Sequence, residues 1–249
     1  MPAGPAGPAF PRPRDLWGRL GGWTLLAVPG ILFLAAFFGL PLLRMAITSV
    51  SDPSPASYLV FTESPLYLRV LGTTFRTAFV VTAICLAMGY PYAYAMHHAG
   101  PRLAAVLVVA LLLPFWSSLL VRTYAWTVLL QDTGVINSVL RELGLIDHPL
   151  ALMRNTLGVT IGMSQILLPY MALPIYAAMR RIDPDLTPAA ASLGAPPFTA
   201  FRRVFLPLSL PGVLAGSLLV FVLALGFYIT PALLGSPHDA MLSELIVAR

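Results

Sequence analysis

The side chains that could do chemistry in this chain are few and widely separated. The chain has one cysteine, Cys85, and four histidines, and their positions match no metal-ligand spacing. No pair of carboxylates, and no nucleophile with a histidine partner, is predicted to lie at the same level of the molecule. A Walker A phosphate-binding motif requires lysine, and all 15 basic residues are arginine. The sequence therefore predicts no catalytic residue, no metal site and no cofactor, and we do not expect an enzyme.

A different kind of site is indicated by the segment 188–212, PAAASLGAPPFTAFRRVFLPLSLPG. Pro188, at the first helical position after the N-cap Thr187, and the helix formers Ala189, Ala190 and Ala191 predict a short helix with small side chains. Gly194 can adopt the left-handed conformation that ends such a helix. A second helix is predicted from Pro197 and is expected to stop at Pro207.

The second helix carries an apolar face, because Phe198, Phe201 and Phe205 recur at helical spacing while Arg202 and Arg203 point elsewhere. Two interpretations fit that pattern equally well. The helix could dock in a groove of a partner protein. It could instead lie on the membrane surface, with its arginines near lipid phosphates.

Composition places these residues in a membrane protein. The chain is 58% hydrophobic and only 10% charged, whereas soluble domains are about 25% charged. Five apolar segments are long enough to cross a bilayer, and they fall at roughly 23–50, 73–96, 103–126, 156–179 and 211–234. Because a backbone in lipid must satisfy its own hydrogen bonds, all five are predicted to be helices.

The arginines predict the orientation. Residues 1–22, the 97–102 turn and the 180–210 loop carry most of those outside the spans, which places these three segments in the cytoplasm. Residues 1–22 are rich in Pro, Gly and Ala and are predicted to be a disordered cytoplasmic tail; a cleaved signal peptide is the alternative. His97 and His98 are expected to be solvated in the cytoplasmic turn. The predicted domains are the tail, a first transmembrane helix at 23–50, and a transmembrane domain at 70–249 that contains the loop 180–210.

The loop resembles the coupling loop of permease subunits in bacterial binding-protein-dependent ABC importers. Three further segments, at 114–126 (PFWSSLLVRTYAW), 134–150 (GVINSVLRELGLIDHPL) and 167–179 (LLPYMALPIYAAM), look like the B-type permease of spermidine/putrescine importers. The resemblance implies an all-α fold, the type I importer permease bundle. It also implies that the loop docks an ATPase through Ala189, Ala190, Gly194, Phe198, Phe201, Phe205 and Pro207. The family usually has Glu where this chain has Pro188.

The same resemblance implies partners and a substrate path. The partners are two ATP-binding subunits, a second permease subunit and a periplasmic substrate-binding protein, in the lipid of a bacterial inner membrane, with no nucleic acid. The path residues suggested are Phe115, Trp116, Tyr124, Tyr170 and Tyr176. For the first three, an interfacial aromatic belt is an equal alternative. Arg122 is expected at the outer interface or paired with Asp132.

Two alternative functions stay open. One is a permease for ferric iron, thiosulfate or molybdate on the same scaffold, and the other is a stand-alone secondary transporter. Family members have a further span after the region that resembles LSELIVAR. We therefore expect five transmembrane helices here, with a sixth missing at the C-terminus and Arg249 outside the cell.

Overall fold

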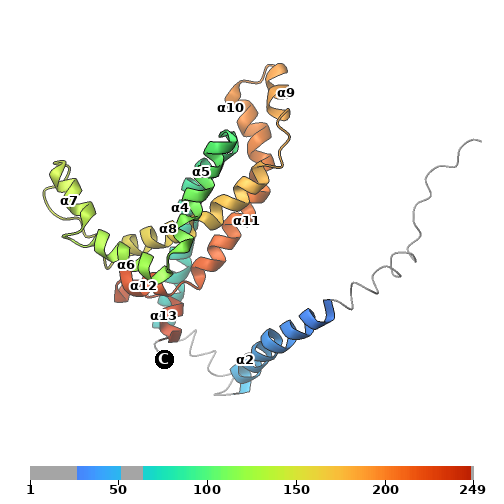
Figure 1. Cartoon of the computed structure of the whole chain (residues 1–249). Helices are drawn as coiled ribbons and strands as arrows, with labels where there is room; N and C mark the ends of the chain where they lie inside the picture. The colour runs from blue at the N-terminus through green and yellow to red at the C-terminus, as the bar shows by residue number, and fades with distance from the viewer. Residues whose placement is uncertain (1–26, 52–63, 248–249) are drawn as a thin grey trace, which may run out of the picture. The chain divides into compact units, whose positions relative to one another are not determined.

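The computed structural model describes residues 27–51 and 64–247, which form two units that are described separately (Figure 1). The predicted tail and the start of the first span lie outside the described residues. The first unit is one apolar helix, Ala27–Ser51, whose residues are all exposed. Its middle is a π-helical segment, η1 (Ala35–Gly39), followed by α2 (Leu40–Ser51).

The second unit is built on three long helices, α4 (Pro65–His98), α8 (Thr156–Met179) and α11 (Leu206–Leu225). α8 packs extensively against both α4 and α11. It is the most buried of the three helices, since 61% of its most apolar 18-residue stretch is buried. α4 has 34 residues, which corresponds to about 50 Å at 1.5 Å per residue and exceeds the apolar thickness of a bilayer. Its ends must therefore extend beyond the lipid core or the helix must tilt.

Glycines allow these three helices to approach closely. A Cβ at Gly212 of α11 would lie 2.5 Å from the Cβ of Ala178, and one at Gly216 would lie 2.9 Å from the Met171 carbonyl oxygen. Gly89 of α4 faces Met171 in the same way, at 2.9 Å from Cγ. Small residues at such contacts are typical of helix packing in membranes, where dispersion contacts replace the hydrophobic effect.

The predicted span 103–126 is not one continuous helix, because the structure breaks it between Trp116 and Leu119; the two halves form a broken span or a re-entrant loop. α5 (Pro101–Leu112) continues into a 3-10 turn, η2 (Leu113–Trp116). The segment Leu119–Glu142, which begins with α6 (Leu119–Leu130), then leaves at 97°. Pro114 lacks an amide hydrogen, and Ser117, three residues later, is extended, with its hydroxyl donating to the Pro114 carbonyl at 2.8 Å. Together they end the first half and turn the chain.

The prediction that Pro207 ends a helix is also wrong, and the fifth span lies earlier than 211–234. Helical structure is continuous from Pro197 to Leu225, through α10 (Pro197–Ala200), a π-helical segment η3 (Phe201–Phe205) and α11. The Leu206 amide donates to the Phe201 carbonyl across the wider turn. This widening just before Pro207 lets the helix pass the proline without a normal hydrogen bond.

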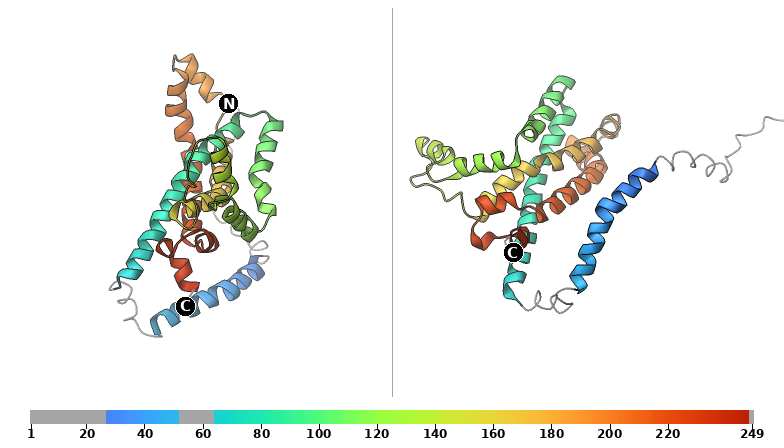
Figure 2. Two further views of the ribbon diagram at one scale, coloured as in Figure 1. Left: turned by 90° about the vertical axis from the view of Figure 1, so that its left-hand side faces the viewer. Right: turned by 60° about the horizontal axis from the view of Figure 1, so that its bottom comes forward.

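Shorter helices complete the second unit. α7 (Val135–Glu142) follows α6, and α9 (Leu186–Ser192) follows α8. After α11 the chain forms α12 (Ile229–Leu234), a 3-10 turn η4 (Pro237–Asp239) and α13 (Leu242–Val247). α9 and α10 lie at one end of the unit and α13 at the opposite end (Figures 1 and 2). The end with α13 is fixed by hydrogen bonds, including Leu242 N to Thr74 Oγ1 at 2.9 Å.

Candidate functional site

The loop 180–210 forms a tight corner between two helices. α9 ends in a pair of hydrogen bonds, Gly194 N to Ala191 O at 2.9 Å and Ala195 N to Ala190 O at 3.1 Å, which is the Schellman arrangement. Gly194 has a φ of +85°, so the predicted left-handed conformation is confirmed. The helix begins at Leu186, earlier than predicted, and Asp185 replaces Thr187 as its N-cap. α10 begins at Pro197 as expected.

One face of this corner is apolar and open to solvent. Leu193 is 90% exposed and Phe198 is 72% exposed, one on each side of Gly194. Ala189 and Pro207 are also exposed, and Ala190 is half-buried. Phe198 and Ala189 were predicted as docking residues, whereas Leu193 was missed, although its place directly before the helix-ending glycine could have drawn attention to it. Two large apolar side chains held out by a rigid turn are suited to contact a partner.

The opposite face of the same segment is turned inward. Phe205 is 5% exposed, and its ring centroid lies 5.5 Å from that of Tyr94 and 5.3 Å from that of His97, both on α4. Phe201 is half-buried with its ring 5.7 Å from that of Tyr94. His97 is therefore part of an aromatic cluster, and the expectation that it is solvated is wrong. This aromatic junction, comprising Tyr94, His97, Phe201 and Phe205, joins the loop to α4.

A second connection lies one turn further on. The Tyr90 and Ser209 hydroxyls are 3.0 Å apart, and Ser209 also donates to the Leu206 carbonyl at 2.8 Å. Two arginines of the loop, Arg202 and Arg203, are exposed and line a pocket of about 280 Å³ with Phe198 and Thr199. The apolar and the basic parts of the loop thus adjoin each other.

The break between α5 and α6 brings aromatic side chains against α8. The rings of Phe115 and Tyr170 lie 5.4 Å apart, and the guanidinium carbon of Arg122 lies 5.8 Å from the Phe115 ring centre. Within residues 64–247, Arg122 is not paired with Asp132, and its buried Nε has no hydrogen-bond partner. An arginine stacked on an aromatic ring with an unused donor can receive an acceptor from a ligand or a partner.

The other predicted path residues are not gathered at this wall. Trp116 is 80% exposed and Tyr124 is 67% exposed. Tyr176 lies six residues beyond Tyr170 on α8, which corresponds to about 9 Å along the axis. Its hydroxyl accepts a hydrogen bond from Arg180 Nη1 at 3.4 Å. The structure therefore brings together Phe115 and Tyr170 and separates Tyr176 from them.

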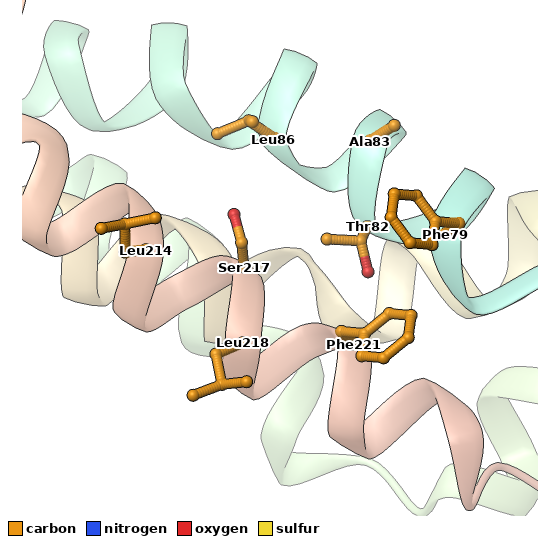
Figure 3. A pocket seen from close by; sticks show the side chains of 8 residues that line it. All are labelled: Phe79, Thr82, Ala83, Leu86, Leu214, Ser217, Leu218 and Phe221. Carbon is orange, nitrogen blue, oxygen red and sulfur yellow. The ribbon is translucent and has the colours of Figure 1, made fainter. Parts of the chain in front are cut away.

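A large groove of about 510 Å³ runs between α4 and α11 (Figure 3). Its two polar side chains are satisfied internally, since Thr82 donates to the Ala78 carbonyl at 2.7 Å and Ser217 lies 3.9 Å from the Met171 sulfur. Phe79 and Phe221 pack edge to face at one end with ring centres 5.5 Å apart. The groove offers no charge and suits apolar surfaces rather than a polar solute.

The described part of the chain has no group of three or more His, Cys, Asp or Glu residues that could hold a metal ion. One carboxylate outside the long helices, that of Glu244, has a shifted pKa. Burial raises the pKa of Glu244 in α13, and the hydrogen bond from Met241 N, at 3.2 Å, opposes that shift.

Comparisons with known proteins agree with this architecture. The chain is 34% identical to the spermidine/putrescine transport system permease protein PotB of Haemophilus influenzae, over 89% of this chain and 78% of that protein. It is 32% identical to the molybdenum transport system permease protein ModB of Mycobacterium bovis, over 82% of this chain and 73% of that protein. A chain of a bacterial alginate ABC transporter, crystallised with its alginate-bound periplasmic protein, shares the fold with a TM-score of 0.69 at 16% identity, over 94% and 84% of the two chains.

The family match extends over residues 9–248 and is described as the binding-protein-dependent transport system inner membrane component. The predicted all-α permease fold, the transport function and the inner-membrane location are confirmed. The chain belongs to the family of inner-membrane permease components of binding-protein-dependent transport systems.

Proposed function

We propose that this chain is a permease subunit that imports polyamines and forms half of a translocation path. Its partners are two ATP-binding subunits, a second permease subunit and a periplasmic substrate-binding protein, and ATP hydrolysis belongs to the ATP-binding subunits rather than to this chain. The observation that carries the cargo assignment is the aromatic wall of Phe115 and Tyr170, together with the resemblance to spermidine/putrescine permeases. Aromatic faces attract ammonium groups and also accept the methylene stretches of a polyamine.

A polyamine also needs negative charges near its ammonium ends. The five predicted spans contain no Asp or Glu, so carboxylates for the ammonium ends must come from the second permease subunit or from Asp132. Those carboxylates would also offset Arg122, whose charge beside Phe115 repels a cation.

The loop 180–210 is proposed to dock the ATPase and to transmit its movement. Leu193 and Phe198 supply the exposed apolar contact, with Ala189, Ala190 and Pro207 beside them. Phe201 and Phe205 link that contact to α4 through the aromatic junction. α11 then carries any movement to α8 along the close contacts at Gly212 and Gly216. The arginine bias supports a cytoplasmic position for this loop.

A second cargo class is favoured by Arg122. Its unused, buried Nε and its place beside the aromatic wall suit an oxyanion. The molybdenum permease among the relatives makes molybdate the natural probe of that class.

Uptake measurements on the assembled complex test both candidates. Vesicles containing the chain, its ATPase, its permease partner and its binding protein should be offered labelled spermidine and labelled molybdate. We expect ATP-dependent spermidine uptake that Tyr170→Ala lowers more than it lowers assembly, with Tyr228→Ala as the control for loss of an aromatic ring outside the wall. Arg122→Gln should preserve spermidine uptake.

Three results would contradict parts of the proposal. Molybdate uptake that depends on Arg122, without spermidine uptake, would replace the cargo. Uptake in vesicles that lack the ATPase would reject the coupled importer. Equal effects of Tyr170→Ala and Tyr228→Ala would remove the aromatic wall from the path.

A further inference from the structure

A separate pocket of about 340 Å³ lies where α4 ends, α5 begins and α8 ends. It is separate from the aromatic wall, because its lining residues on α8 begin at Tyr176, six residues or about 9 Å after Tyr170, at the end of α8 that leads into the loop 180–210. Water occupies about 30 Å³ per molecule, so the space exceeds that of a single ordered water several times over. The apolar part of its wall includes Met96, Pro101, Ala104 and Ile182.

Three polar side chains line the same pocket, namely His97, Tyr176 and Arg180. The Arg180 guanidinium uses one donor on the Tyr176 hydroxyl, at 3.4 Å, and its carbon lies 6.0 Å from the Tyr176 ring centre. A guanidinium has five N–H donors, and the tyrosine hydroxyl still has its own hydrogen to donate. Among the described residues, the buried Nδ1 of His97 has no hydrogen-bond partner. The polar groups of this wall are therefore mainly donors.

The neighbouring sequence adds to the positive charge. Arg102 follows Pro101 of the wall directly, and Arg181 follows Arg180. Asp183 and Asp185 are nearby in sequence, but both are exposed and neither lines the pocket. The site thus combines an arginine fork, a hydroxyl donor and an apolar lining at a helix junction.

We propose that this pocket binds a phosphate-bearing anion, with the phosphate on Arg180 and the Tyr176 hydroxyl. Charge-assisted hydrogen bonds from arginine are the usual means of holding phosphate. The apolar lining favours the headgroup and glycerol of an anionic phospholipid over free phosphate, since basic pockets between membrane helices on the cytoplasmic side bind such headgroups. The site is separate from the aromatic wall of Phe115 and Tyr170, and it would make the importer sensitive to membrane composition.

The test uses the complete complex in nanodiscs of phosphatidylcholine, with or without phosphatidylglycerol. Native mass spectrometry measures the lipid retained, and inorganic phosphate is added to the phosphatidylcholine discs as a separate arm. We expect selective retention of phosphatidylglycerol and about a tenfold loss of it in Arg180→Gln, as for removal of one hydrogen bond to a charged group. Arg181→Gln is the matched control, because Arg181 is exposed, as Arg180 is, but lines no part of the pocket.

A second variant fills the pocket without changing its charge, and so tests whether the lipid binds inside it. Ala99 lines the pocket and is half-buried, so Ala99→Leu should also reduce lipid retention while the complex still assembles. Binding of inorganic phosphate that depends on Arg180, with no preference for phosphatidylglycerol, would support the phosphate site and assign it to a soluble anion. Equal losses in Arg180→Gln and Arg181→Gln, or no binding in either arm, would overturn the proposal.

Discussion

Alanine substitutions of two phenylalanines in the same helical stretch should impair transport in different ways. Phe205 is 5% exposed and belongs to the aromatic junction, whereas Phe198 is 72% exposed and contacts solvent. Phe205→Ala should leave the ATPase bound but uncouple it, because the loop then loses its connection to α4. Phe198→Ala should leave the chain stable but weaken binding of the ATPase.

The burial of the two rings sets the size of each effect. Removing a buried phenylalanine ring costs about 3–5 kcal/mol, and Phe205 also loses edge-to-face contacts with Tyr94 worth about 0.5–1.5 kcal/mol. These terms overlap, so about 3–5 kcal/mol is the expected destabilisation of the junction. An exposed substitution changes stability by about 0.5 kcal/mol or less. The loss of an interface anchor instead costs about 2 kcal/mol of binding, or roughly a thirtyfold weaker ATPase contact.

Three measurements on the same reconstituted complex separate these outcomes. Thermal unfolding reports stability, copurification at several ATPase concentrations reports binding, and the ratio of substrate uptake to ATP hydrolysis reports coupling. Phe205→Ala should lower the melting temperature and the coupling ratio at normal binding. Phe198→Ala should reduce binding and recover normal coupling at high ATPase concentration.

The opposite pattern would refute this division of the loop. If Phe205→Ala released the ATPase while the melting temperature stayed the same, the ring would have to face the partner rather than α4. If Phe198→Ala had no effect on binding, the exposed apolar face would not be the docking surface.

Three further changes test the loop, the core and the C-terminal end. Gly194→Ala meets no atom within 4 Å but forces a side chain into a φ of +85°, so it should destabilise the corner by about 1–2 kcal/mol and reduce copurification with the ATPase. Gly212→Val should lower the yield of folded protein on size-exclusion chromatography, because even a Cβ would lie 2.5 Å from Ala178 Cβ; Gly226→Val, where nothing lies within 4 Å, is the control. Because burial raises the pKa of Glu244 above its ordinary 4.5, folding favours the protonated acid and loses stability as pH rises through the raised pKa. Glu244→Gln should therefore raise the melting temperature at neutral pH and have little effect below pH 4.5.

Local sequence signals predicted several features well. The apolar segment 156–179 forms one helix with those bounds, because its length and hydropathy leave no other state in lipid. Gly194 takes the left-handed conformation that its place after an alanine-rich helix suggested. Both features depend on residues close together in the chain. The assignments of docking and path residues stay predictions.

Other features depend on contacts that no local pattern contains. Pro114 and Pro207 look alike in sequence, yet the first ends a helix and the second does not. The difference lies in η3, where the wider turn, closed by the Leu206 amide on the Phe201 carbonyl, lets the helix continue past Pro207. His97 was placed in solvent because it is polar and near a turn, but the distant Phe205 packs on its ring. Likewise the helical period puts Phe198, Phe201 and Phe205 on one apolar face, but Phe205 is 5% exposed and Phe198 is 72% exposed. The period of a regular α-helix could not reveal the π-helical segment between them.

That π-helical segment has a consequence for the rotational phase of the loop. Each residue turns an α-helix by about 100°, so one extra residue between Phe201 and Phe205 rotates everything before it relative to Gly212. Phe205 can face α4 while Phe198 faces away, although the two lie seven positions apart and would share a face in a regular helix. The number of residues between Phe201 and Gly212 thus sets the direction in which the proposed docking surface faces. A single insertion or deletion between Phe201 and Gly212 would therefore turn the proposed docking surface away from its partner.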